Sequence, residues 1–209
     1  MKDFKEISIH WESVEEELSA FEKLLSEYQD LSESSDILPF FRKSPNLSAF
    51  IGKIYFPTLS NINRISYEFD FFGDFKADLA IGDSMKESYA FIEFEDGKHN
   101  SIFKTSKAKY QKDWSNRFEH GYSQIIDWFW KLDDLKQTTS FKEKFNSNDI
   151  DFRGILIIGR DSYLSDYDFK RFKWRSKHTI IQSKSIHCIT YDELLEDLKQ
   201  QIKFLQFIK

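Results

Sequence analysis

The sequence predicts a single α/β domain, and three patterns along its 209 residues lead to this prediction. Residues 11–28 carry apolar side chains at alternating steps of three and four, which is the stripe of an amphipathic helix. Residues 64–72, 76–82 and 88–95 are short strand-like runs separated by turn residues, the spacing of an antiparallel meander. Residues 153–160, "RGILIIGR", are apolar on both sides and indicate a fully buried strand.

The remaining segments complete the predicted order of elements. "SESSD" (32–36) is expected to be a loop, and prolines break the residues that follow it into short helices. Residues 114–135 have helical periodicity. After them we expect a polar loop, "KQTTSFKEKFNSND", and one or two strands in "KHTIIQ" and "SIHCITY". Residues 191–208 form a closing helix, with Asp192 as its N-terminal cap.

The predicted organisation is one globular unit, in which a helical segment (1–60) packs on a core domain (61–209). The apolar stripe of residues 11–28 is expected to face this core, because helices chiefly attach to their own domain through an amphipathic face. The alternative is that the stripe is an assembly surface of a structural interaction protein.

The composition narrows the class of protein. The start of the sequence lacks an apolar signal core and no apolar run approaches a membrane span, so we expect a cytoplasmic protein that contacts no membrane. The single cysteine, Cys188, excludes an internal disulfide and a multi-cysteine zinc site, and we expect it to be a small core residue.

Two basic segments stand out against the net charge of −5. Residues 98–117 contain six lysines and arginines and one acid, and residues 168–178 contain five lysines and arginines. Such segments can bind a polyanion even on an acidic protein, although a solvated charged face is the alternative. The candidate contacts are His99, Lys104, Lys107, Lys109, Lys170, Arg171, Lys173 and Arg175.

Two acids lie two positions apart in the apolar run "YAFIEFE". Side chains alternate across a strand, so Glu93 and Glu95 point to the same face, where they repel unless a cation neutralises them. Asp78 lies in the preceding strand, which brings a third carboxylate close. Hard oxygen ligands suit Mg²⁺ or Mn²⁺, and this arrangement predicts a phosphodiester-cleaving site. The alternatives are a cationic side chain as partner, or acids on a solvated face that lysines neutralise.

The motifs "DFFGDFKADLAIGD", "YAFIEFEDGKHNSIF", "GYSQIIDW", "RGILIIGR" and "ITYDELL" occur in this order. From about Glu68 to about Leu195 the chain resembles the Shedu-type nuclease domain of bacterial anti-phage defence, a branch of the PD-(D/E)XK superfamily. The resemblance implies a restriction-endonuclease-like core of helix, three-stranded meander, helix and strand. The N-terminal helical segment and the C-terminal helix are additions to this core.

The resemblance also implies roles for individual residues. Asp78 matches the acid of the second core strand and Glu93 the first acid of the third strand. Glu95 stands where many members keep a lysine, so it serves as an extra metal ligand or as the base. Lys98 is either a displaced lysine or an exposed loop residue. Gln124 is expected to point at the site and hold a water or a phosphate.

Two further acids are left open. Glu68, in the first strand, either approaches the metals or has a surface or cross-strand role. In some relatives an acid on the first helix joins the site, and no N-terminal acid is assigned to it here.

These inferences predict a Mg²⁺- or Mn²⁺-dependent endonuclease that acts on DNA, double-stranded DNA in preference to RNA, and forms a homo-oligomer. The basic segments would hold the phosphate backbone without reading sequence. The alternative is a catalytically inactive relative that binds nucleic acid or a protein partner in a defence complex, because Glu95 replaces the usual lysine.

Overall fold

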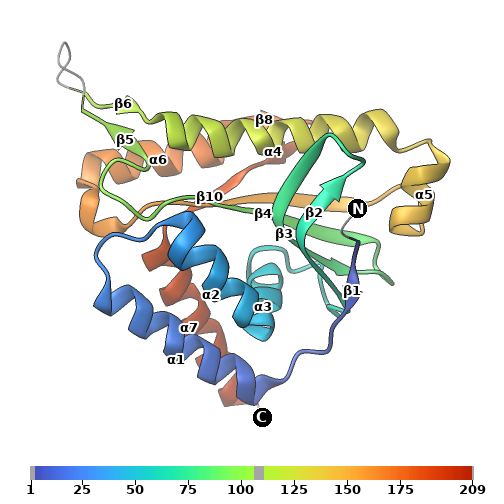
Figure 1. Ribbon diagram of the computed structural model, residues 1–209, viewed down its shortest axis with the longest axis horizontal. Coiled ribbons are helices and arrows are strands. Elements are labelled where there is room, and N and C mark those ends of the chain that lie inside the picture. The colour runs from blue at the N-terminus through green and yellow to red at the C-terminus, as the bar shows by residue number, and fades with distance from the viewer. Residues whose placement is uncertain (1–2, 106–110, 209) are drawn as a thin grey trace.

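A six-stranded mixed sheet forms the middle layer of the computed structural model, which describes residues 3–105 and 111–208 (Figure 1). The strand order is β1-β2-β3-β4-β7-β10. Strands β2, β3 and β4 form the predicted antiparallel meander, β7 pairs with β4 in parallel, and β10 pairs with β7 in parallel. The bounds are β1 Lys5–Glu6, β2 Arg64–Phe71, β3 Phe75–Asp83, β4 Ser88–Phe94, β7 Asp151–Ile157 and β10 His187–Ile189.

Two short hairpins accompany the sheet. One pairs β5 (Phe103–Lys104) with β6 (Asp113–Trp114), and the other pairs β8 (Ile180–Ile181) with β9 (Lys184–Ser185).

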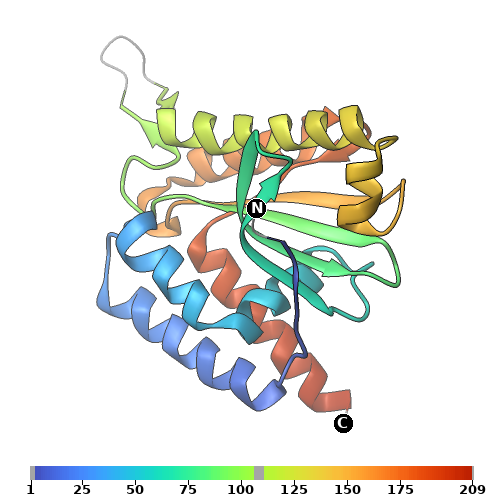
Figure 2. The same cartoon turned by 45° about the vertical axis from the view of Figure 1, so that its right-hand side comes forward.

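One layer of helices covers the first face of the sheet (Figures 1 and 2). It consists of α1 (Trp11–Glu27), α2 (Leu38–Lys43), α3 (Pro45–Tyr55) and α7 (Tyr191–Ile208). The apolar stripe of α1 is buried in a core that these helices share with the sheet. Val14, Leu18, Phe21 and Leu25 of the stripe therefore pack on the domain itself and are not free to serve as an assembly surface, whereas Tyr28 is 52% exposed.

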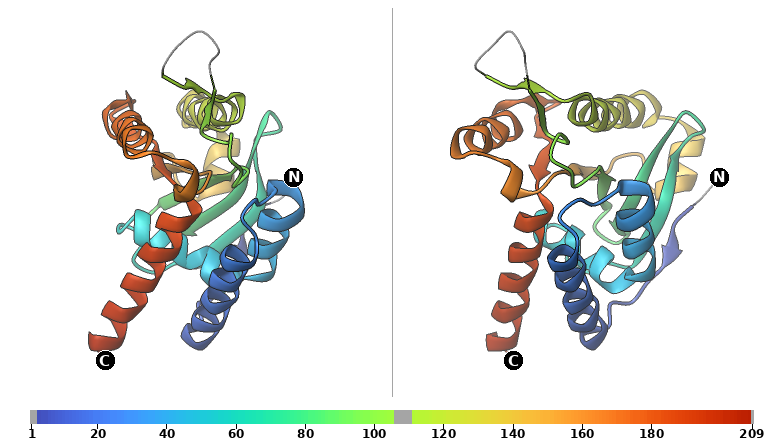
Figure 3. Two further views of the ribbon diagram at one scale, coloured as in Figure 1. Left: turned by 90° about the vertical axis from the view of Figure 1, so that its left-hand side faces the viewer. Right: turned by 60° about the vertical axis from the view of Figure 1, so that its left-hand side comes forward.

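The second layer covers the opposite face and contains α4 (Asn116–Leu135), α5 (Thr139–Phe145) and α6 (Asp166–His178) (Figure 3). The long helix α4 buries Phe118, Trp128 and Phe129 against the sheet. Cys188 is fully buried in this core, as expected.

The structure corrects the predicted polar loop after α4, because residues 139–145 form α5. The Thr138 side chain accepts a hydrogen bond from Phe141 N, which caps the helix. Phe141 and Phe145, four residues apart, are both buried. Their burial outweighs the polar composition of the segment.

The predicted loop at residues 32–36 is also wrong, because Glu33–Ile37 form a π-helical turn. Ser32 N donates to Asp36 Oδ2 at 2.7 Å and Glu33 N donates to Asp96 Oδ1 at 2.8 Å. The second bond ties this turn to the segment after β4, where a bridge between Leu31 and Gly97 lies beside it.

The cap of α7 is Thr190 and not the predicted Asp192. Glu193 N donates to Thr190 Oγ1 and Thr190 N donates to Glu193 Oε2, each at 3.1 Å, which is a capping box. Asp192 lies inside the first turn and accepts two hydrogen bonds from Arg160 Nε at 3.0 Å. Among the helices of the described residues, none is long and apolar enough to cross a membrane.

Candidate functional site

The register of the sheet brings the predicted acids together at one end of β4. Leu79 of β3 pairs with Ile92 of β4, so Asp78 lies across from Glu93. Asp78 Oδ2 accepts a hydrogen bond from Phe94 N at 2.9 Å, beyond the last backbone pairs of these two strands. Ile92 packs in the core between the sheet and the layer of α1, α2, α3 and α7. Because side chains alternate along a strand, Glu93 and Glu95 point to the opposite face, which α4 covers.

Glu93 is a buried carboxylate that is only half paired. Its side chain is 7% exposed, and Oε1 accepts a hydrogen bond from Gln124 Nε2. Its Oε2 is buried with no hydrogen-bond partner in the described part of the chain. Burial, followed by the charges of Asp78 and Glu95, raises the pKa of Glu93 well above its usual value.

Glu95 contacts two side chains from the first two turns of α4. Arg117 Nη1 lies 3.1 Å from Glu95 Oε2, and His120 Nδ1 lies 3.2 Å from Oε1. Burial still raises the pKa of Glu95 to about 7, against the hydrogen bond from His120. The cationic side chain that the sequence left open as a partner is therefore present at Glu95.

Arg117 joins Glu95 to two further acids. Its guanidinium lies 2.9 Å from Glu33 Oε2 and 3.4 Å from Asp96 Oδ2. Glu33, in the π-helical turn after the first helix, is an N-terminal acid beside the site that the sequence analysis did not identify. Its negative charge contributes to the raised pKa of Asp78, Glu93 and Glu95.

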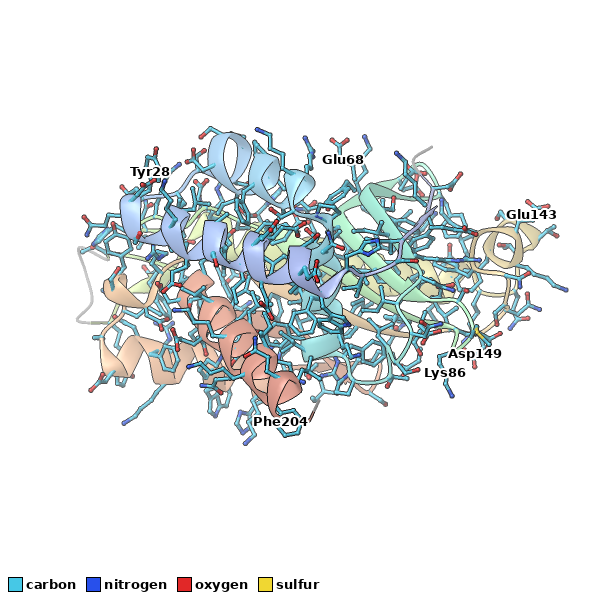
Figure 4. The ribbon with its side chains drawn as sticks, turned by 90° about the horizontal axis from the view of Figure 1, so that it is seen from below. Tyr28, Glu68, Lys86, Glu143, Asp149 and Phe204 are labelled. Atoms are coloured by element: carbon cyan, nitrogen blue, oxygen red, sulfur yellow. The ribbon has the colours of Figure 1, made fainter. Side chains whose placement is uncertain are left out.

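Asp78 completes the acidic group. Burial raises its pKa to about 7, against the hydrogen bond from Phe94 N, and the charges of Glu33 and Glu95 add to the effect. Glu68 lies across from Asp78 on β2, but its carboxylate pairs with Arg42 at 3.4 Å. Figure 4 shows Glu68 at the periphery of the molecule. The surface role left open for Glu68 therefore fits its position better than a direct approach to the acids.

Lys98 lies beside the acids without contacting the predicted ligands. Its Nζ lies 3.1 Å from Asp96 Oδ2, and the side chain is 38% exposed. Gln124, in contrast, lies against Glu93 as the resemblance implied.

Sequence reasoning missed Arg117, His120 and Glu33. Arg117, His120 and Gln124 follow one another at steps of three and four on α4, so they share one helix face. This spacing could have identified the first two from the third. The position of Glu33 depends on the contact with Asp96, which no local pattern predicts.

The donor chemistry of the site fits a hard divalent cation. Carboxylates are the ligands that Mg²⁺ and Mn²⁺ prefer, and Glu93 Oε2 is a buried oxygen without a partner in the described chain. The positions of these side chains, in contrast, do not form a complete set of metal ligands. Within residues 3–105 and 111–208, no three or more His, Cys, Asp or Glu side chains are grouped so that they could hold a metal ion.

The predicted nucleic-acid contacts divide into two sets. Lys104 is exposed and its Nζ lies 2.8 Å from Asn116 Oδ1, while His99 is exposed with its ring 5.4 Å from that of Tyr163. Lys170 is also exposed. Lys107 and Lys109 lie outside the described residues.

The other three predicted contacts on α6 are engaged within the fold. Arg171 Nη1 donates to the carbonyl of Lys112 at 2.5 Å, and Lys173 pairs with Glu193 at 2.7 Å. Arg175 makes a two-pronged pair with Glu119 at 2.7 and 2.8 Å. These charges connect α6 to its neighbours.

The fold and these residues define an α/β protein with buried acids clustered at the end of a central strand. Over residues 30–195, the sequence matches the family described as Shedu protein SduA, C-terminal. This match covers most of the chain, and the chain belongs to that family. Among curated proteins, none matches the sequence.

Proposed function

We propose that this protein is a metal-dependent endonuclease that hydrolyses phosphodiester bonds in DNA in anti-phage defence. Its Shedu family supports the defence setting. The observation that carries the nuclease proposal is Glu93 Oε2, a buried carboxylate oxygen without a partner in the described chain, close to other acids that raise the pKa of Glu93. A bound cation would relieve that cost.

The acids would hold the ion through Asp78, Glu93 and Glu95. A bound Mg²⁺ or Mn²⁺ would lower the pKa of a water and neutralise charge that builds on the phosphate. Gln124, which donates to Glu93 and lies 3.3 Å from His120 Nδ1, is positioned to orient a water or a phosphate oxygen. Lys98 is a second group for this task, provided that it leaves Asp96.

The order of elements supports a restriction-endonuclease-like core of the PD-(D/E)XK type. Helix α3 precedes the meander of β2, β3 and β4, and α4 and β7 follow it in the sequence. For the DNA contact we favour His99, Lys104 and Lys170, because these side chains are exposed. We also propose a homo-oligomer, as relatives of this type tend to assemble.

A cleavage assay tests the proposal. Plasmid and linear DNA are incubated with the protein in Mg²⁺, in Mn²⁺ or in EDTA, beside Asp78→Ala and Glu93→Ala. Glu143→Ala is the matched control, because this exposed acid lies on α5 at the far end of the molecule (Figure 4). Cutting that needs metal and both site acids, but not Glu143, supports the enzyme. Cutting in EDTA, or cutting by both site variants, contradicts it.

A second candidate function is supported by the partners of Glu95. Arg117 already pairs with this carboxylate and His120 contacts it, and the described acids do not form a ready metal cage. Such a site suits a catalytically inactive module that binds nucleic acid or a partner in a defence complex. DNA binding that persists in EDTA, with no cutting and no Mn²⁺ uptake by calorimetry, would favour this module.

A further inference from the structure

Helix α6 exposes a stripe of aromatic and basic side chains on its outer face. This α6 stripe consists of Tyr167, Lys170, Trp174, Lys177 and His178, all exposed and separated by steps of three, four, three and one. Tyr167, Lys170, Trp174 and Lys177 follow at steps of three and four, and His178 lies four residues after Trp174, so all five lie on one side of the helix. Trp174 is 63% exposed and Tyr167 is 57% exposed, which is unusual for two large rings about two turns apart on one helix.

The inner face of α6 accounts for the attachment of the helix to the fold. Phe172 is buried in the upper core, and Ser176 Oγ donates to the carbonyl of Ile186 at 2.9 Å. Arg175 pairs with Glu119 in the first turn of α4 and lies over the Phe118 ring at 4.9 Å. The α6 stripe is therefore not needed to hold the helix in place.

The stripe is positively charged and its rings are held in place. In the described part of the chain, neither Lys170 nor Lys177 makes an ion pair or a side-chain hydrogen bond. The Trp174 ring stacks on the His178 ring at 4.9 Å and 16°. The Tyr167 hydroxyl accepts a hydrogen bond from Gln111 Nε2 at 2.6 Å. Two flat rings thus stand beside two free ammonium groups.

We infer that the α6 stripe binds single-stranded nucleic acid, with Trp174 and Tyr167 stacking on unpaired bases and Lys170 and Lys177 contacting the phosphates. Aromatic faces beside a cationic track are the features by which proteins bind single strands without reading sequence. In a duplex the bases are already stacked on one another, so the rings would gain nothing there and only the lysines would contribute. This inference rests on the proposed function, because it names the form of substrate that the nuclease would take.

The test measures binding without cleavage. Fluorescence anisotropy follows a labelled dT20 strand and a blunt duplex of equal length, in EDTA, for the wild type, Trp174→Ala and the double variant Lys170→Gln/Lys177→Gln. The matched control is Trp130→Ala, because Trp130 is 56% exposed but lies on α4.

We expect Trp174→Ala to weaken dT20 binding by about tenfold, within the range for one stacked base, and to leave duplex binding nearly unchanged. Trp130→Ala should bind dT20 like the wild type. The double lysine variant should reduce the salt dependence of dT20 binding by about 0.7 per lysine in log–log slope.

Three results would overturn the inference. In the first, Trp174→Ala and Trp130→Ala have the same effect. In the second, duplex and single-strand binding fall together, which would make the stripe a phosphate surface only. In the third, Trp174→Ala changes the oligomeric state by light scattering while dT20 binding is unaltered, which would make it a protein contact. If the protein binds dT20 through Trp174 but never cleaves DNA, the nuclease proposal fails and this inference stands.

Discussion

Asp78→Asn should stabilise the protein, although it replaces a residue of the candidate site. The asparagine keeps an oxygen that can accept the hydrogen bond from Phe94 N, but it removes a charge that is costly to bury. A pKa raised from 3.8 to about 7 corresponds to about 4 kcal/mol of unfavourable free energy in the ionised form. Neighbouring acids share part of this cost, so we expect a gain of about 2–4 kcal/mol at pH 8.

The pH dependence gives this prediction its sign. The folded protein keeps the Asp78 proton up to about pH 7, whereas the unfolded chain loses it near pH 4. Between these values the unfolded state binds fewer protons, so the Asp78 contribution to wild-type stability falls as the pH rises and levels off above pH 7. The gain in Asp78→Asn should therefore be smaller at pH 5.5 than at pH 8, by about 2 kcal/mol.

Urea unfolding at both pH values, in EDTA, measures this difference. The control is Asp83→Asn, at the other end of β3, where both oxygens of the buried carboxylate accept backbone hydrogen bonds, Oδ1 from Met85 N at 3.1 Å and Oδ2 from Asn61 N at 2.8 Å, so an amide loses one acceptor. That substitution should lower stability by about 1–3 kcal/mol. If Asp78→Asn is no more stable than the wild type at pH 8, or if its gain is equal at both pH values, the reasoning about the buried acid is refuted.

Three further predictions concern the surroundings of Glu95. Tyr191→Phe removes the hydrogen bond from the buried hydroxyl to the Glu95 carbonyl (2.5 Å) and should lower the unfolding free energy by about 1–3 kcal/mol in urea; an unchanged midpoint would contradict this. Gly121→Ala places a Cβ 2.8 Å from Leu156 Cδ1 and 3.1 Å from Glu95 Oε1, and should lower the unfolding free energy by about 1–3 kcal/mol. The measurement is the melting temperature, and an unchanged value would show that α4 can shift freely. Arg117→Gln should lower stability at pH 8 by on the order of 1 kcal/mol, since Arg117 is half exposed, and less at pH 5.5, where Glu95 is protonated. An equal loss at both values would exclude the pairing with Glu95 as the main cause and leave the pairs with Glu33 and Asp96.

Much of the sheet could be predicted because strands have a short repeat that depends on local sequence. The alternation around Ile92 and Phe94 determines which side Glu93 and Glu95 occupy, and the structure confirms that both face α4. The apolar run of β7 likewise predicts a strand that is buried on both sides. These strand features are predictable because a shift of the strand register by one residue would bury the wrong side chains.

The other features of the fold and the site could not be predicted from the local sequence. The α5 segment has only two buried residues, Phe141 and Phe145, in a polar run, so its helical character depends on the pocket that receives them. Glu33 and Arg117 are far from Glu95 along the chain and meet it only through tertiary packing. Arg171 and Arg175 show the same limit, because a basic segment looks alike whether its charges hold DNA or a neighbouring helix.

The pairing of α1 with α7 has a consequence for synthesis on the ribosome. The last helix begins at Tyr191, whereas the apolar stripe of α1 ends near Leu25, so translation at 5–20 residues per second leaves the stripe without that neighbour for roughly 8–33 s. The Tyr191 hydroxyl also donates a hydrogen bond to the carbonyl of Glu95. A nascent chain therefore carries its acids in an unfinished setting until Tyr191 and the helix that it begins have been made.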